Sequence, residues 1–413
     1  RSAKRLSVST KINTEINNMT TQTKTIWREV KLGDVATVNP ESVGKNFPFD
    51  KIFYVDISSV GTGVAESPQE MELKDAPSRA KRLVKDGDTI LSTVRPNRRS
   101  FLYIKEPKEN LVVSTGFAVV RPEKVNSRYL YYVISNQTFT DYLTRHAKGS
   151  AYPAVDAETI EKADFMLPSD TEQNTIAEIL GTYDDLIENN TRRIQILEQI
   201  ARAVYTEWFV NFRFPGHEKV KMVDSGTDFG KIPEGWEVKK LGDMVYNFDS
   251  KRRPISKMKR AQIQGDVPYY GAAKIIDYVN EVLLDGKYLL FAEDGSVITK
   301  EGYPVLQFVN EKFWVSNHAH VLQGKGISTE HLYIALSRFS IQGYITGAAQ
   351  PKITQENFNR IPMLIPDADT RTQFDAFIEP LFQLQFSLNN TLSNLRKTRD
   401  LLLPKLVTGK IRI

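Results

Sequence analysis

Basic side chains next to aromatic rings are the residues of this sequence whose types and spacing could do chemistry. The ten residues from Lys251 to Arg260 hold six Lys or Arg and no acid. Such a cluster can bind the phosphates of a nucleic acid, and the alternative is an ordinary solvated loop. The pair Tyr269-Tyr270 follows within ten residues of Arg260. We interpret the segment as a phosphate-binding arm.

A looser basic set lies earlier in the chain, around Arg95-Pro-Asn97-Arg98-Arg99, just past an apolar run. Arg and Asn are the side chains that pair with the edges of guanine and adenine, so this set could read bases. Ordinary surface charges are the alternative. The residues predicted to contact DNA in the whole chain are Lys74, Arg79, Lys81, Arg82, Arg95, Asn97, Arg98, Arg99, Tyr152, Lys251, Arg252, Arg253, Lys257, Lys259, Arg260, Tyr269, Tyr270, Lys274, His318, His320, Gln350 and Lys352.

His318 and His320 alternate on an expected strand and could together ligate a metal. No third ligand is evident nearby, so we favour a structural role or a DNA contact over a metal site. Thiolate-bound metals are excluded because the chain has no cysteine. Nucleotide hydrolysis at a P-loop is not indicated, and no glycine-rich cofactor loop or Ser/His/Asp arrangement is found. We therefore predict no catalytic residue, no cofactor and no metal.

The composition is that of a mildly basic globular protein. The 413 residues are 41% hydrophobic and 25% charged, with a formal net charge of +5. This balance is compatible with nucleic acid as a partner without requiring it. No run of 18 or more apolar residues occurs, so no membrane span is expected and a cytoplasmic protein is predicted.

Two apolar heptad patterns predict the elements that must position these residues. The first runs from Gln173 to Val210, and the second recurs near the C-terminus, where Asn389-Asn390-Thr391 repeats Asn189-Asn190-Thr191. Heptad spacing predicts long helices that pack on each other, with an Asn on each seam to fix the register. The predicted pairing residues are Ile176, Leu180, Tyr183, Ile187, Asn190, Ile194, Leu197, Leu381, Leu384, Leu388, Asn390, Leu395 and Leu402.

The plan of the chain repeats. The string from Trp27 to Asp34 is echoed from Trp236 to Asp243, and Gly149 to Pro153 is echoed from Gly347 to Pro351. We predict an α+β protein in which two mixed α/β domains are separated by two long antiparallel helices, with an internal pseudo-two-fold repeat. The predicted segments are a tail over 1–26, a domain over 27–168, a long helix over 169–212, a linker over 213–235, a second domain over 236–366 and a second long helix over 367–413.

Particular strings resemble one known family, the specificity subunits of Type I restriction–modification enzymes. Glu207 to Gly216 is similar to the end of that family's central conserved region, and Leu401 to Lys410 is similar to its closing stretch. The second domain resembles a recurrent target-recognition domain in three strings: Val267 to Ala272, Ala292 to Ser296 and Phe313 to His320. The resemblance covers 27–413.

The resemblance implies a DNA-recognition subunit without a catalytic centre. In the family, each domain reads one half of a split double-stranded DNA target. The long helices dock two adenine methyltransferase subunits, and restriction/translocase subunits join through that complex; no membrane is involved. Two other function classes stay open on the residues alone. One is a stand-alone nuclease or methyltransferase with an unrecognised site, and the other is a coiled-coil scaffold that never touches DNA.

Overall fold

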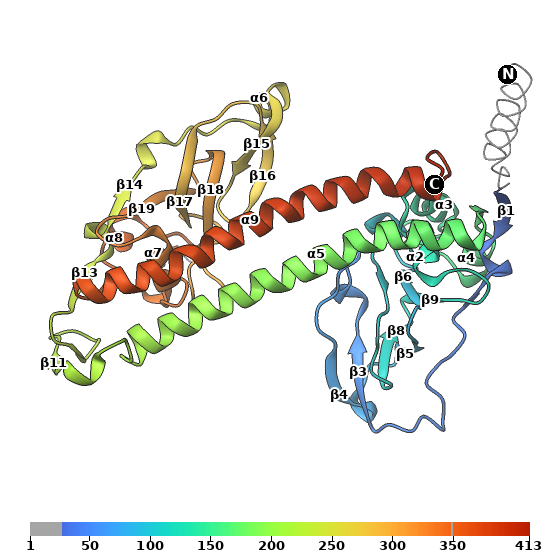
Figure 1. The fold of residues 1–413 in the computed structure, drawn as a ribbon, viewed down its shortest axis with the longest axis horizontal. Helices are drawn as coiled ribbons and strands as arrows, with labels where there is room; N and C mark the ends of the chain where they lie inside the picture. The colour runs from blue at the N-terminus through green and yellow to red at the C-terminus, as the bar shows by residue number, and fades with distance from the viewer. Residues whose placement is uncertain (1–26, 348–349) are drawn as a thin grey trace, which may run out of the picture. The chain divides into compact units, whose positions relative to one another are not determined.

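The structure of the chain is a computed structural model that describes residues 27–347 and 350–413 (Figure 1). The predicted tail over 1–26 lies outside the described residues. Two compact units are present: 27–188 with 393–413, and 189–392. Two long helices, α5 (Asp170–Tyr205) and α9 (Ala368–Val407), each contribute residues to both units.

The first unit holds a two-stranded ladder and two four-stranded sheets, in the orders β2-β9-β6-β7 and β4-β3-β8-β5. All pairings are antiparallel except that of β3 with β8. The strands are β1 (Arg28–Lys31), β2 (Ala36–Val38), β3 (Lys51–Val55), β4 (Gln69–Glu72), β5 (Ala80–Leu83), β6 (Thr89–Ser92), β7 (Phe101–Tyr103), β8 (Leu111–Ser114), β9 (Phe117–Pro122) and β10 (Asp164–Leu167). The short helices are α2 (Ser127–Ser135), α3 (Gln137–His146) and α4 (Ala157–Glu161).

Helix α2 connects the sheets of the first unit to the long helices because it is buried on two sides. Leu130 and Ile134 pack with sheet residues such as Val120. On its other side, Tyr129 and Tyr132 pack with residues of α5 and α9. An apolar surface this broad is expected of a helix that lies between two layers rather than on the surface.

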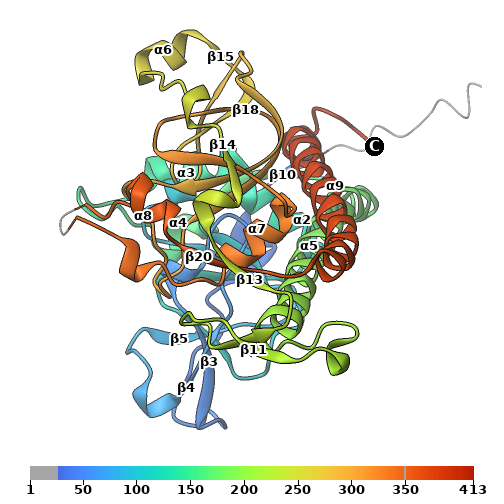
Figure 2. The ribbon, with the colours of Figure 1, turned by 90° about the vertical axis from the view of Figure 1, so that its left-hand side faces the viewer.

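The second unit is built on one six-stranded sheet in the order β14-β19-β17-β18-β15-β16, with β15 parallel to β18. Helix α6 lies at one tip of this unit, away from α7 and α8 (Figure 2). The predicted linker contains the antiparallel hairpin of β11 (Met222–Asp224) and β12 (Lys231–Pro233). The remaining elements are β13 (Glu237–Lys240), β14 (Val245–Asn247), α6 (Lys257–Gln262), β15 (Gln264–Tyr270), β16 (Ile275–Val279), β17 (Leu284–Ala292), β18 (Leu306–Val315), β19 (Ala319–Gly324), α7 (Thr329–Leu336), α8 (Gln355–Asn359) and β20 (Pro362–Ile365).

The predicted internal repeat is confirmed by hydrogen bonds that recur in both units. Strand β1 pairs antiparallel with β10, and β13 pairs in the same way with β20. The Leu32 amide donates to Ala163 O at 2.9 Å, and the Leu241 amide donates to Ile361 O at 2.7 Å. The Nε1 atom of Trp27 donates to Glu172, and that of Trp236 donates to Asp367. In each unit the tryptophan thereby ties its domain to the start of a long helix.

The two long helices pair antiparallel, as predicted. In the first unit, Leu180 near the start of α5 packs with Leu406 at the end of α9. In the second unit, Ala201 near the end of α5 packs with Phe374 at the start of α9. Helix α5 ends at Tyr205, and 206–210 continue as a π-helical turn.

The residues predicted for the seam of α5 are buried to different extents. Ile176, Leu180 and Asn190 are buried. Tyr183, Ile187, Ile194 and Leu197 are half-buried.

In α9 the predicted seam is partly wrong. Leu388 is buried, but Leu384 is 40% exposed and Asn390 is exposed. Ile378 and Phe382 are buried instead and, with Phe374, share a cluster with residues of the second domain. These three positions are four apart, which is the spacing of a helix that covers a globular core rather than that of a heptad seam. Leu381, Leu395 and Leu402 are half-buried.

Leu388 and Leu384 make a matched pair of positions on α9. We expect Leu388→Asp to lower the free energy of unfolding by about 3 kcal/mol or more, because it places an unpaired carboxylate at a buried site. Leu384→Asp makes the same change in helix propensity at an exposed site, so its unfolding temperature should stay near that of the wild type. Thermal unfolding of the two variants followed by circular dichroism checks this. Equal unfolding temperatures for both variants would contradict the burial of Leu388.

Candidate nucleic-acid interface

Two loops of the first unit are joined at the end of β6, and together we name them the first loop pair (93–99 and 148–154). The Arg95 amide donates to Pro153 O at 2.7 Å, and the Val155 amide donates to Thr93 O at 3.0 Å. Arg95 and Arg99 have left-handed backbone conformations, with φ of 51° and 56°. Residues other than glycine adopt this backbone conformation only where the surrounding structure stabilises it. The first loop pair is therefore a fixed platform rather than a free loop.

The side chains of the first loop pair divide into outward and inward groups. The Arg95 guanidinium lies 4.6 Å from the centroid of the Tyr152 ring, which is 70% exposed. Asn97 and Arg98 are exposed as well. Arg99 turns inward and donates to Ser135 O at 2.8 Å and to Gln137 Oε1 at 3.0 Å. Arg99 thus anchors the loop. Arg95 is half-buried and donates to Ala151 O at 3.4 Å, while Asn97, Arg98 and the Tyr152 ring are the exposed groups.

The other predicted basic residues of the first domain lie on or near β5. Arg79 is connected to the first loop pair through the turn at Thr115 and Gly116. The Thr115 amide donates to Arg79 O, and the Thr93 amide of the loop pair donates to Gly116 O. The Arg79 guanidinium pairs with Asp56 at 2.8 Å but is 55% exposed. Lys74 and Lys81 are exposed, and Arg82 is half-buried.

The second unit has an equivalent platform, the second loop pair (293–299 and 346–353), of which 348–349 lie outside the described residues. The Gly295 amide donates to Pro351 O at 3.1 Å, and the Ile353 amide donates to Glu293 O at 3.0 Å. An isolated antiparallel β-bridge joins Asp294 to Lys352, and an equivalent β-bridge joins Val94 to Ala154 in the first unit. Gly347 has a φ of +88°, and a Cβ there would lie 2.4 Å from Gln350 O, so the turn requires glycine.

The second loop pair presents different side chains from the first. His318 Nδ1 lies 2.8 Å from an Asp294 oxygen, and Lys352 Nζ lies 3.8 Å from Glu293. His318, Gln350 and Lys352 are exposed. Sequence reasoning named neither Glu293 nor Asp294 as a site residue, although carboxylates can accept from the cytosine amine. Aligning Asp294 with Val94 through the repeat would have placed both acids on this platform.

In the structure, some residues of the predicted basic arm are bound to other parts of the protein and the others are exposed. Arg252 donates to Glu293 at 2.7 Å and to Ala319 O at 3.0 Å. Arg260 donates to Asp277 at 2.8 Å and lies over the Tyr269 ring. Both guanidinium groups are therefore committed within the protein, which corrects the prediction that they bind phosphate. Lys251, Arg253, Lys257, Lys259 and also Lys274 are exposed.

Three further predicted DNA contacts are wrong because the side chains are buried. Tyr269 is 1% exposed, and its hydroxyl accepts from the Ile255 amide. Tyr270 donates to Glu311 at 2.7 Å, and burial together with this carboxylate raises the pKa of Tyr270 well above its usual range. His320 lies beneath the surface with Nδ1 2.6 Å from Asp249. Burial works to raise the pKa of Asp249, but the hydrogen bond and charge of His320 outweigh burial and lower it.

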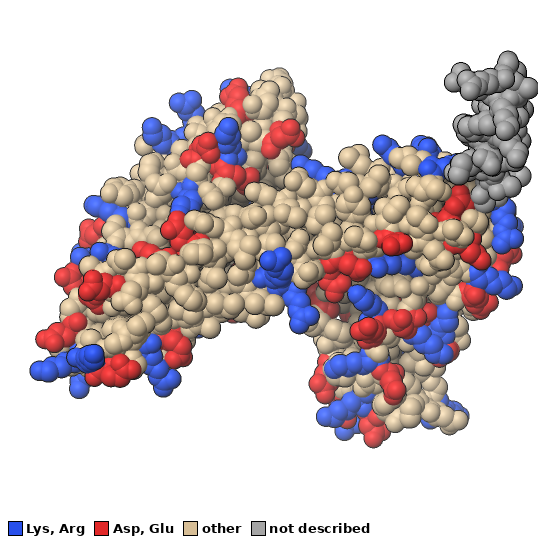
Figure 3. Space-filling view, viewed as in Figure 1, with Lys and Arg blue, Asp and Glu red and all other residues tan. Residues whose placement is uncertain are grey.

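Charged side chains of both signs share the face of the molecule that Figure 3 shows. In the view of Figure 3, Lys and Arg side chains are interspersed with Asp and Glu in both units. Within the described residues, no group of three or more His, Cys, Asp or Glu is placed to hold a metal ion. No helix in 27–347 or 350–413 is long and apolar enough to cross a membrane.

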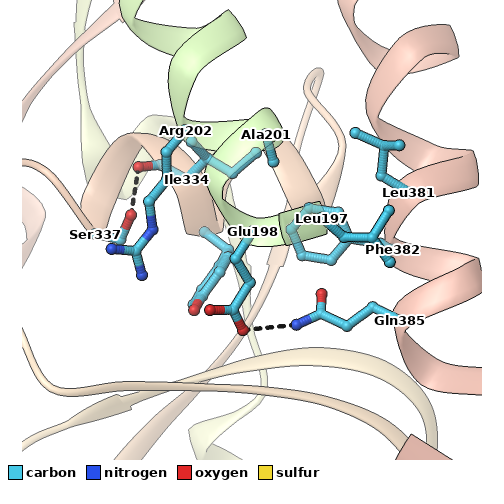
Figure 4. A pocket seen from close by; sticks show the side chains of 10 residues that line it. Leu197, Glu198, Ala201, Arg202, Ile334, Ser337, Leu381, Phe382 and Gln385 are labelled. Carbon is cyan, nitrogen blue, oxygen red and sulfur yellow. Dashed lines mark hydrogen bonds between the residues drawn. The ribbon is translucent and has the colours of Figure 1, made fainter. Parts of the chain in front are cut away.

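A hollow in the second unit lies among α5, α7 and α9 (Figure 4). Apolar residues such as Leu197 and Phe382 form part of its wall. Glu198 of α5 accepts a hydrogen bond from Gln385 of α9 at 2.8 Å. We interpret the hollow as part of the helix contact, with this hydrogen bond joining the two helices.

Comparison with known proteins gives the same family for both domains. The family model described as Type I restriction modification DNA specificity domain matches residues 25–199 and 233–395. The MjaIX specificity subunit of Methanocaldococcus jannaschii is 29% identical over 344 residues, which is 79% of this chain and 78% of that protein. The HindI specificity subunit of Haemophilus influenzae is 24% identical, over 93% of this chain and 99% of that protein.

A solved structure shows the same fold. The S subunit of a Type I restriction–modification system from M. genitalium has a TM-score of 0.60 at 14% identity, over 94% of this chain and 97% of that one. The family model matches well over half of the chain, in two copies. This chain belongs to the family of Type I restriction–modification DNA specificity subunits.

Proposed function

We propose that this chain recognises a two-part sequence in duplex DNA, with one domain reading each half. The observation that carries the proposal is the pair of platforms built by the same backbone hydrogen bonds at the ends of equivalent strands. Their side chains differ, since the first offers Arg, Asn and Tyr where the second offers Asp and Lys, with His318 beside Asp294. Two platforms with one geometry and different hydrogen-bonding groups suit two half-sites of different sequence.

The reading heads in this proposal are 27–168 and 236–366, and the frame is the helical segments 169–212 and 367–413. The first head would read through Arg95, Asn97, Arg98 and Tyr152. The second would read through Asp294, His318, Gln350 and Lys352. Phosphate contacts that fix the register would come from exposed cations outside the two platforms, such as Lys251 and Arg253.

The chain would act as a subunit rather than alone. In the proposed complex, two adenine methyltransferase subunits dock on the long helices, and restriction/translocase subunits join through them, in the cytoplasm. Exposed apolar side chains on the helices support such docking. In the second unit these are Ile196 and Ile200 on α5, and Phe377 and Leu384 on α9, each at least 38% exposed. Apolar side chains left on a helix surface commonly mark a protein contact.

The division of the arm gives a test of the phosphate contacts. Replacing Lys251 and Arg253 together by Gln should weaken binding to every duplex and lower the salt slope of binding by about 2, because two phosphate contacts are lost. The unfolding temperature should not change. Arg252→Gln is the matched control, since it removes an anchor and should lower the unfolding temperature instead. Fluorescence anisotropy over a series of salt concentrations measures the slope. An unchanged slope in the double variant would return these residues to ordinary surface charge.

A domain exchange tests the proposed function itself. Replacing 27–168 by the corresponding domain of a related specificity subunit should change one half of the methylated DNA motif. The other half and the spacing between halves should stay the same, because they would depend on 236–366 and on the helices. Sequencing of modified adenines in cells that carry the exchanged chain gives the motif. A change in both halves, or in neither, would contradict the proposal.

A further inference from the structure

The arm (Lys251 to Arg260) and the end of helix α6 are held to the second unit at several points. Arg252 is tied to Glu293 and to the carbonyls of Asn317 and Ala319. The Arg253 carbonyl accepts from Trp314 Nε1 at 2.6 Å.

Its far end is anchored as firmly as its start. Ile255 is buried in a cluster with Tyr269 and Trp314. Arg260 donates to Asp277 and also to Ile255 O at 2.6 Å. Ser256 caps helix α6, its side chain accepting from the Lys259 amide. A segment fixed in this way loses little conformational freedom when it binds.

Helix α6 exposes one apolar side chain between two cations. Met258 is 77% exposed, the highest value among the exposed large hydrophobic side chains of the described residues. Lys257 and Lys259 are exposed on either side, and no acid occurs from Lys251 to Gly265. Strand β16 packs against α6 and adds exposed Ile276 and Tyr278. A single exposed apolar side chain is common on protein surfaces, but Met258 stands on a rigid support between two cations, with two further exposed apolar side chains on the neighbouring strand.

We propose that α6 inserts the Met258 side chain into a groove of the duplex, next to the half-site that the second domain reads. This inference rests on the proposed function and extends it to base pairs beyond the platform. The flanking lysines would bind phosphates on the two sides of the groove, which leaves the apolar tip facing the base pairs. Methionine is among the apolar side chains that proteins use as wedges between base steps.

Charge complementarity favours DNA over a protein as the occupant. Four exposed cations accompany Met258 along the arm, namely Lys251, Arg253, Lys257 and Lys259. Near the start of the arm, Arg252 contacts Glu293 of the second loop pair, and the arm ends in α6, so a duplex held on that platform could continue along the arm. Figures 1 and 2 show α6 at the tip of the unit, away from α7 and α8.

The test uses the full chain assembled with the methyltransferase subunits of its own system. The probe is a duplex that carries the methylated motif, with 2-aminopurine placed in turn at each flanking base pair. Wild-type protein should raise the fluorescence at one flanking position, because unstacked 2-aminopurine is brighter. Met258→Ala should abolish that rise and weaken binding about tenfold, without changing the salt slope. Met258→Leu, which keeps the apolar volume, should bind within about twofold of the wild type.

A control separates the lysines from the wedge. Replacing Lys257 and Lys259 by Gln should lower the salt slope by about 2, which the Met258 variants should not do. Wild-type binding and fluorescence in Met258→Ala would overturn this inference alone. Loss of methyltransferase assembly in that variant without DNA present would overturn it too, since Met258 would then contact protein. A wild-type complex that binds no duplex would overturn the proposed function as well.

Discussion

Each long helix must bury two faces at once, one against the other long helix and one against a domain, and the rest of the structure depends on this constraint. In the first unit, Asp184 of α5 accepts from Tyr132 of the domain at 2.7 Å and from Arg399 of α9 at 2.8 Å. In the second unit, Phe374 of α9 lies with Phe209 and with Trp236 at the start of the second domain. Within each unit, the domain therefore cannot turn on the helix segments of that unit without breaking contacts to both.

These contacts, which hold each domain on its helices, do not involve the loop pairs, so the side chains of the two loop pairs can differ. The backbone bonds that join them are the same in both units, whereas only one unit places acids on the platform. Backbone hydrogen bonds tolerate a change of side chain, and this separates the frame from the residues that would read DNA. The family match in two copies fits such a design, because each copy carries the frame with its own loops.

The repeat and the fold class could be predicted from the sequence because their signals are local: a tryptophan before Leu-Gly-Asp in each copy, and a glycine where each closing turn needs one. The α9 seam could not be, since Leu384 and Phe382 are equally apolar and only the domain packed beside the helix decides which is buried. Arg252 and Arg260 were misassigned for a similar reason. Their acidic partners, Glu293 and Asp277, lie 41 and 17 residues away in the sequence. The sequence of the arm alone therefore shows cations without acidic partners.

Hydrogen–deuterium exchange can show whether the two loop pairs are the surfaces that meet DNA. Exchange of the methyltransferase-assembled chain would be compared with and without a duplex carrying its methylated motif. We expect slower exchange in the motif complex within both loop pairs, 93–99 with 148–154 and 293–299 with 346–353. A duplex with one altered half-site should remove protection from one loop pair only. Protection confined to the long helices, with both loop pairs unchanged, would show that the loop pairs do not meet DNA.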